Sequence, residues 1–159
     1  MNDRDVVIVE GVRTAVGRRD GSLSGVHPAV LLADVLNELL RRAGLPSDVV
    51  EDVVCGCVDQ IGDQAANIGR NAVLAAGFPY TIPATTVDRQ CGSGQQAVHF
   101  AANLVQSGVV DAAIGCGVES MSRVPILSPL QTEHGFPMPP QVLERYPMVM
   151  QGQAADMIA

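Results

Sequence analysis

The sequence predicts an α/β fold in which helices cover a mixed, mainly parallel sheet. Short apolar runs alternate with segments whose apolar residues recur at helical spacing. This order is typical of parallel strands joined by right-handed crossovers. Hydrophobic residues make up 47% of the 159 residues and charged residues only 17%, which argues against a disordered chain. A chain of this length can bury one sizeable core.

Four segments have the composition of buried strands, because they are short, apolar and bounded by glycine, proline or polar residues. They are expected at residues 6–9, 53–58, 84–88 and 112–116. Two cysteines of the second strand, Cys55 and Cys57, are interpreted as small buried thiols whose side chains lie on opposite faces. That placement disfavours a shared metal or a disulfide.

Three helices are expected between these strands. The first begins at Pro28, a favoured first-turn residue, and ends before Gly44. The second covers residues 67–76 and the third residues 93–107. The third helix contains no Asp, Glu, Lys or Arg. We therefore expect it to be buried on several sides, in an inner layer covered by more protein than this chain supplies.

The chain is expected to have two regions, residues 1–124 and residues 125–159. The first holds the alternating strands and helices. The second begins with a proline-rich stretch of little periodicity and ends in an apolar helical start without a stop signal. We interpret it as a loop-like region outside the sheet that is cut inside an element.

The charge balance limits the classes of partner. Net charge is −7, and no basic cluster is longer than two arginines. A nucleic-acid surface is therefore not expected, since phosphate contacts need a basic face. The amino terminus is polar and no apolar run has the length of a membrane span. We expect a cytoplasmic protein with reduced thiols and no metal site.

The strongest local signal is the segment 86–97, TVDRQCGSGQQA. A strand delivers Cys91 to a glycine-flanked turn, and a helix begins at once. The helix N-terminus offers unpaired N–H groups and a partial positive charge, which favour the nucleophilic thiolate. The alternative is a structural cysteine that burial makes inert. The turn by itself leaves both interpretations open.

Longer motifs around this turn resemble the thiolase family. Residues 91–98 (CGSGQQAV) and 115–122 (GCGVESMS) are similar to its acyl-enzyme signature. Residues 9–17 resemble its opening strand and loop, and residues 60–70 resemble the segment that reaches the partner subunit in thiolase dimers. The variant at 87–90, VDRQ, favours the degradative branch that acts on fatty acids or steroid side chains.

The resemblance implies an amino-terminal thiolase half, which is an incomplete half of a five-layer α-β-α-β-α fold with the start of a loop domain at residues 125–159. It implies that the Cys91 thiolate accepts the acyl group of an acyl-CoA and that the Cys91 N–H serves an oxyanion hole. Coenzyme A and acyl-CoA are then substrates, no cofactor is bound covalently, and the intact protein is a homodimer or tetramer. Residues that bind coenzyme A are not assigned.

Some features depart from the family pattern. The activating histidine and the second catalytic cysteine of thiolases come from the carboxy-terminal half, so this chain is expected to be inactive alone. The three histidines, at 27, 99 and 134, are expected to be structural or solvated. Cys116 stands where the family has glycine, and packing is its expected role. Glu119 and the residues after it are interpreted as a capping turn, with a ligand site as the alternative.

Two other functions remain open. The first is a non-catalytic half-thiolase subunit that assembles with a partner chain. The second is a related condensing enzyme such as a ketoacyl synthase, against which the stretch 117–122, GVESMS, argues.

Overall fold

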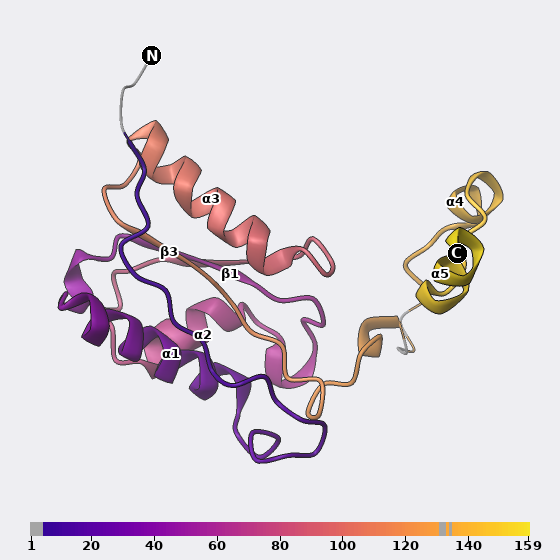
Figure 1. Ribbon diagram of the computed structural model, residues 1–159, viewed down its shortest axis with the longest axis horizontal. Coiled ribbons are helices and arrows are strands. Elements are labelled where there is room, and N and C mark those ends of the chain that lie inside the picture. Colours follow the sequence, from indigo (N-terminus) through magenta and orange to yellow (C-terminus); the bar gives the residue numbers. More distant parts are fainter. Residues whose placement is uncertain (1–4, 131–132, 134) are drawn as a thin grey trace. The chain divides into compact units, whose positions relative to one another are not determined.

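Three parallel strands form the sheet, as the sequence predicts. They are β1 (Asp52–Gly56), β2 (Ala84–Val87) and β3 (Ala113–Gly117), in the order β2-β1-β3. The computed structural model describes residues 5–130, 133 and 135–159. The chain divides into two compact units, Met1–Ser128 and Pro129–Ala159, and the sheet belongs to the first (Figure 1).

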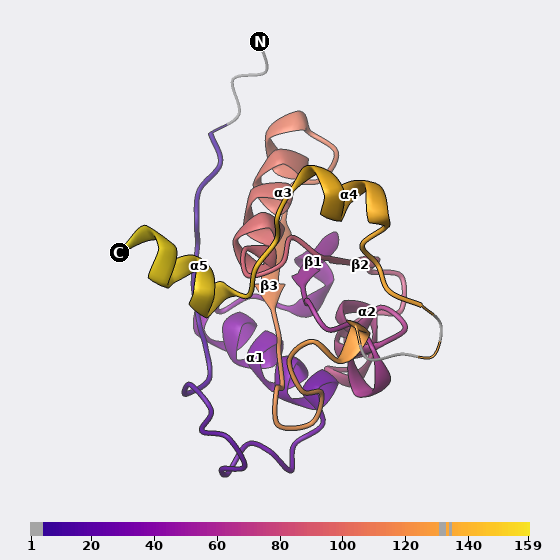
Figure 2. The same cartoon turned by 90° about the vertical axis from the view of Figure 1, so that its right-hand side faces the viewer.

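Helices cover both faces of this sheet. The helices α1 (Pro28–Ala43) and α2 (Ile68–Ala75) lie on one face and α3 (Ser93–Ser107) lies on the other (Figures 1 and 2). The larger core cluster lies between the sheet and α1 and α2, and includes Leu36 and Ile68, both fully buried. A smaller cluster under α3 is built from Val54, Ala97 and Ala101. The result is a three-layer α-β-α arrangement.

Local chemistry explains where the helices begin and end. The side chain of His27 accepts the N–H of Ala29 and caps α1, which ends at Gly44 with a left-handed φ of 67°. Asn67 caps α2 by accepting the N–H of Arg70. Gly108, with φ 76°, ends α3. Two short 3₁₀ helices, Ser47–Val49 and Gly62–Gln64, occupy connections.

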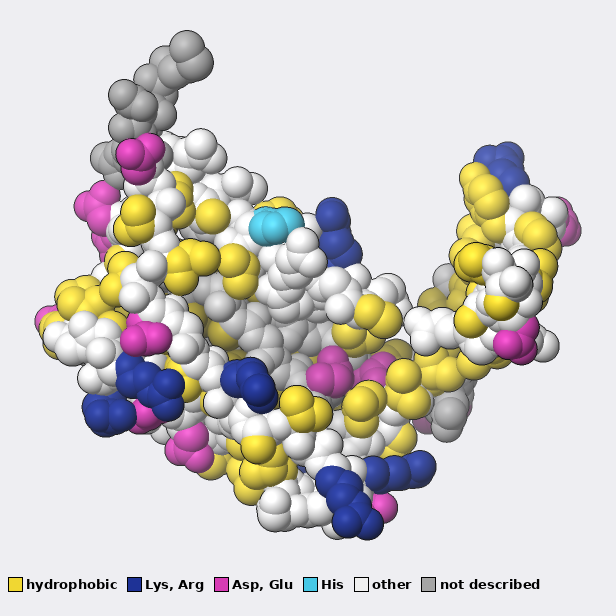
Figure 3. Space-filling view, viewed as in Figure 1, with side chains coloured by type: hydrophobic (Ala, Val, Ile, Leu, Met, Phe, Trp, Pro, Cys, Tyr) yellow, Lys and Arg dark blue, Asp and Glu magenta, His cyan; other side chains and the backbone are white. Residues whose placement is uncertain are grey.

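The helix α3 rests directly on the sheet because glycines face it. A Cβ atom built on Gly56 would lie 2.3 Å from the backbone carbon of Ser93. A Cβ built on Gly115 would lie 2.6 Å from the Cα of Val98. The opposite face of α3 carries no charge and exposes Phe100 (Figure 3). Its expected place in an inner layer stays a prediction.

The strand predicted at residues 6–9 is wrong. These residues form no strand, and the side chains of Val7 and Ile8 are 73% and 85% exposed. A strand needs a hydrogen-bonding neighbour, and an apolar run alone does not supply one. Residues 10–14 instead line one side of a groove of about 290 Å³, which α1 and residues 114–119 line on the other sides.

The expected orientation of two cysteines was also wrong. Cys55 and Cys57 lie on the same face of the sheet, in the core cluster with α1 and α2. Alternate residues of a strand share a face, so positions i and i+2 point the same way. Cys116 pairs in register with Cys55 and packs against the same core, in agreement with a packing role.

The strand β2 is less buried than predicted. It lies at one edge of the three-stranded sheet, and the side chain of Thr85 is exposed. Composition alone did not distinguish this edge strand from a central one.

The second unit, Pro129–Ala159, contains two short helices, α4 (Pro140–Arg145) and α5 (Gln151–Ile158). A 3₁₀ turn, Ser128–Leu130, lies at the boundary. Neither α4 nor α5 has a buried residue. Assigning residues 125–159 to a loop domain stays a prediction. Within the described ranges, no helix is both long and apolar enough to cross a membrane.

Candidate active site

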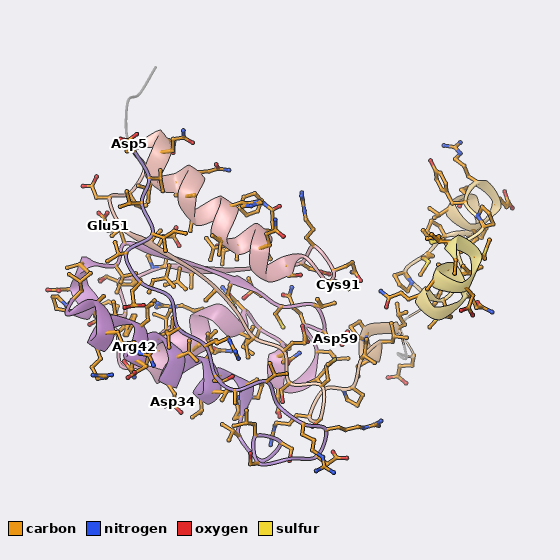
Figure 4. All side chains as sticks on the ribbon, in the orientation of Figure 1. Asp5, Asp34, Arg42, Glu51, Asp59 and Cys91 are labelled. Carbon is orange, nitrogen blue, oxygen red and sulfur yellow. The ribbon has the colours of Figure 1, made fainter. Side chains whose placement is uncertain are left out.

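Cys91 lies in the turn between β2 and α3, as the sequence predicts. The strand ends at Val87 and the helix begins at Ser93. The Cys91 side chain is exposed, and Figure 4 shows it at the end of the sheet where α3 starts. The structure therefore does not support the alternative of a cysteine made inert by burial.

The turn is held by its own side chains. Gln90, directly before Cys91, has a left-handed φ of 47°. Its backbone N–H donates to the Asp88 carboxylate at 2.6 Å. The hydroxyl of Ser93 accepts the N–H of Arg89 at 2.9 Å and donates to the carbonyl of Gln90 at 2.6 Å. A set of short-range bonds therefore fixes the peptide units before the cysteine.

The sheet supports this turn from beneath. Gly56 lies against the backbone of Ser93 and Gly94, and Gly117 lies within close contact of both Gly56 and Gly94. Glycines of β1, β3 and the first turn of α3 are therefore in contact where α3 packs on the sheet. Their lack of side chains allows the backbone atoms to approach this closely.

A network of polar groups lies at the same ends of the strands, where α/β folds gather ligand sites. The Glu119 carboxylate, just after β3, accepts the N–H of Val58 at 2.7 Å and of Asp59 at 3.3 Å. It also accepts the side-chain amide of Gln64 at 2.6 Å. Gln64 is fully buried and accepts the N–H of Ser120. Glu119 therefore connects the end of β3 by hydrogen bonds to the residues after β1 and to the loop at 58–64.

The network was only partly foreseen. Glu119 was expected in a capping turn, which describes the Ser120 contact but not the carboxylate's three N–H donors. Gln64 lies in the segment 60–70, which the sequence compares only with the thiolase segment that reaches the partner subunit. No composition signal separates a buried amide from a solvated one in such a loop, so a longer-range contact was needed to find it.

The environments of the cysteines differ. Burial and the neighbouring Glu119 carboxylate raise the pKa of Cys57 to about 12. The pKa of Cys55 is raised by its hydrogen bond with Cys116 and by burial. Both groups stay as thiols at neutral pH. Their inertness leaves the exposed Cys91 as the better candidate for reaction with a bulky thioester.

Asp59 is a buried carboxyl group in the same region, and Figure 4 places it at the same end of the sheet as Cys91. Its side chain is 4% exposed. Burial, and then the Glu119 charge, raise its pKa above the ordinary value. No local motif around Asp59 distinguishes it from the other acidic residues of the chain.

Two of the three histidines lie in the part of the chain that the structure describes. His27 caps α1 and its Nε2 lies 3.7 Å from the Asp63 carboxylate. His99 is exposed on α3, where Figure 3 shows a histidine on the surface. His134 lies outside the described residues. Among the residues placed in the structure, no group of three or more His, Cys, Asp or Glu could hold a metal ion.

Comparison with known proteins decides the family. Residues 6–157 match the family model described as thiolase, N-terminal domain. The chain belongs to the thiolase family. It is 45% identical over 148 residues to a steroid 3-ketoacyl-CoA thiolase of Mycobacterium tuberculosis, covering 89% of this chain and 36% of that thiolase.

Other thiolases agree with this assignment. The chain is 38% identical over 161 residues to a 3-ketoacyl-CoA thiolase of Acinetobacter baumannii, covering 99% of this chain and 40% of the relative. The crystal structure of the Bacillus anthracis acetyl-CoA acetyltransferase superposes with a TM-score of 0.70 at 42% identity, covering 73% of this chain and 29% of that one. The chain therefore spans well under half the length of these thiolases.

Proposed function

We propose that this chain supplies the acyl-accepting cysteine of a thiolase, and that Cys91 is that residue. The observation that carries the proposal is the position of Cys91, exposed in the turn between β2 and the N-terminus of α3. There the positive end of the α3 dipole favours a negative sulfur and a negative oxygen. Membership of the thiolase family supports the same assignment.

The proposed chemistry is acyl transfer through a thioester. In thiolysis, the Cys91 thiolate attacks the 3-keto carbon of a 3-ketoacyl-CoA, a carbon–sulfur bond forms, the C2–C3 bond breaks, and acetyl-CoA leaves as a carbanion that takes a proton. The thiol of coenzyme A then attacks the acyl thioester, which forms a shortened acyl-CoA and restores the Cys91 thiol. With acetyl-CoA as the donor, the thiolate attacks the thioester carbonyl and coenzyme A is the leaving group. The backbone N–H of Cys91 is proposed to help stabilise the oxyanion of the tetrahedral intermediate.

The proposed substrate class is a 3-ketoacyl-CoA, split by coenzyme A in lipid degradation. Relatives named for steroid 3-ketoacyl-CoA and for β-ketoadipyl-CoA support this class. The VDRQ variant at 87–90 favours the same degradative direction. The complete enzyme is proposed to be a homodimer or tetramer.

This chain alone is proposed to lack turnover, because it spans 36% and 40% of the length of two thiolase relatives and the resemblance places the activating histidine in the carboxy-terminal half. General-base assistance is worth roughly 100- to 10,000-fold in rate. A second candidate function is a half-thiolase subunit that pairs with another chain. The uncharged exposed face of α3, with Val98 and Phe100, favours it. Co-purification of a partner that carries the missing base would support this candidate.

The test is incubation with acetyl-CoA, followed by intact mass and release of coenzyme A. We expect a single acyl adduct that is absent in Cys91→Ala and present in the matched variant Cys116→Ala. An adduct that survives Cys91→Ala would contradict the nucleophile. Steady release of coenzyme A by the isolated chain would contradict the proposed lack of turnover.

A further inference from the structure

The hydroxyl of Ser93 is a distinctive feature of the Cys91 turn. It is buried, and it bonds to the backbone on both sides of the peptide unit between Arg89 and Gln90. Its residue is 4% exposed. The oxygen accepts the Arg89 N–H at 2.9 Å and lies 2.6 Å from the Gln90 carbonyl and 3.4 Å from the Asp88 carboxylate. A hydroxyl has one proton, so the shorter contact, to Gln90, takes it.

These bonds hold a backbone conformation that glutamine does not prefer. Gln90 has φ 47°, in the left-handed region that residues other than glycine rarely adopt. Its N–H is fixed by the Asp88 carboxylate, and its carbonyl accepts both the Ser93 hydroxyl at 2.6 Å and the Ser93 backbone N–H at 3.0 Å. Both polar groups of this residue are therefore bound while the next residue in the chain is Cys91.

Ser93 is itself fixed by the sheet. Its carbonyl carbon would lie 2.3 Å from a Cβ atom on Gly56, so the backbone of the two residues is in direct contact. The hydroxyl thus connects a rigid part of the fold, the β1–α3 contact, to the strained residue before the nucleophile.

We propose that Ser93 is a positioning residue, which holds the peptide units 89–91 so that the sulfur and N–H of Cys91 stay at the N-terminus of α3. This inference rests on the proposed function of Cys91 as the acyl acceptor. Ser93 touches neither substrate nor sulfur in this role and acts through Gln90. Without this hydroxyl, the Arg89 N–H loses its acceptor and the Gln90 carbonyl keeps only the Ser93 N–H, so Gln90 relaxes toward ordinary backbone angles and Cys91 moves away from the helix start.

The competing explanation is that Ser93 is only a small residue that fits at a helix start. The two roles differ in what they change at Cys91. A packing role affects stability alone. A positioning role also changes the reaction of Cys91 with a small electrophile, because thiolate formation depends on the distance to the helix N-terminus.

The test measures alkylation of Cys91 by iodoacetamide from pH 6 to 10 in the full chain, with the modified residue located by fragmenting tryptic peptides. We expect Ser93→Ala to react about 3- to 10-fold more slowly at pH 7 and to reach half of its maximal rate at higher pH. The matched control is Ser107→Ala, which removes an exposed hydroxyl at the other end of α3 and should react like the unaltered chain. Ser93→Thr keeps the hydroxyl and should restore most of the rate.

A second pair of variants covers the case in which Ser93→Ala does not fold. Asp88 is exposed, so its replacement carries less risk. Asp88→Asn removes the charge but keeps an acceptor for the Gln90 N–H, whereas Asp88→Ala removes both. We expect Asp88→Ala to react about 2- to 5-fold more slowly than Asp88→Asn.

Two results would overturn the inference. One is the same rate and pH profile for Ser93→Ala and Ser107→Ala. The other, if Ser93→Ala is unfolded, is the same rate for Asp88→Ala and Asp88→Asn. A failure of acetyl-CoA to acylate Cys91 while these alkylation differences persist would overturn the proposed function and leave the positioning role standing.

Discussion

Gly56→Ala is the sharpest test of how α3 rests on the sheet. The added Cβ atom would lie 2.3 Å from the carbonyl carbon of Ser93 and 2.4 Å from the nitrogen of Gly94. Carbon atoms in contact need about 3.5 Å, so the start of α3 must move by about 1.2 Å. The obstructing atoms are backbone and cannot turn aside. Overpacking costs about 1–3 kcal/mol, and we expect the upper end, about 3 kcal/mol.

The assay is urea unfolding followed by circular dichroism, with Cys91 alkylation measured on the folded protein. The matched control is Gly94→Ala, in the first turn of the same helix, where a Cβ meets nothing within 4 Å. Replacing a helical glycine by alanine should stabilise the chain by about 0.5–1 kcal/mol. A Gly56→Ala chain that is as stable as Gly94→Ala, with unchanged alkylation, would refute the close-contact account.

Three further predictions concern the network and the caps. Glu119→Ala removes the acceptor of the Val58 and Asp59 N–H groups and of the buried Gln64 amide and should lower the unfolding free energy by about 1–3 kcal/mol. Asp34→Ala on α1 should change it little, both in urea melts. The pKa of Asp59 is raised above 3.8, so the folded chain holds that proton more tightly than the unfolded chain, and stability falls as pH rises from about 3.8 through the raised pKa. Asp59→Asn should therefore gain stability relative to the unaltered chain between pH 4 and 7, and a constant difference across that range would contradict the shift. Asn67→Ala removes the side chain that caps α2 and its hydrogen bonds to β2, and should lower the unfolding free energy by about 1–2 kcal/mol. The exposed Asn103→Ala on α3 should change it very little. Equal thermal midpoints for the two variants would contradict the capping role.

The elements with strong local signals were predictable from the sequence. Pro28 and Gly44 mark both ends of α1, and Gly108 marks the end of α3. The turn that carries Cys91 was found because a strand, a glycine pair and a helix follow one another without a gap. Each of these signals acts over a few residues, so the chain itself contains the information.

Features that depend on distant partners were not predictable. The run at residues 6–9 has the composition of a strand, yet it exposes its side chains because nothing among the described residues pairs with it. Gln64 meets Glu119 across 55 positions of sequence. In the sequence, Ser93 is one more small residue of a glycine-rich turn, and nothing indicates that its hydroxyl is buried. A single sequence does not contain the contacts that give these residues their roles.

The central claim is that Cys91 accepts the acyl group, and the most direct test is to locate that group after incubation with acetyl-CoA. Cleavage after Arg89 and Arg123 releases one peptide, residues 90–123, that holds both Cys91 and Cys116. Fragmentation of this peptide distinguishes the two sulfurs. The account predicts a thioester on Cys91. An acyl group on Cys116, Cys55 or Cys57, or an unmodified chain, would contradict it.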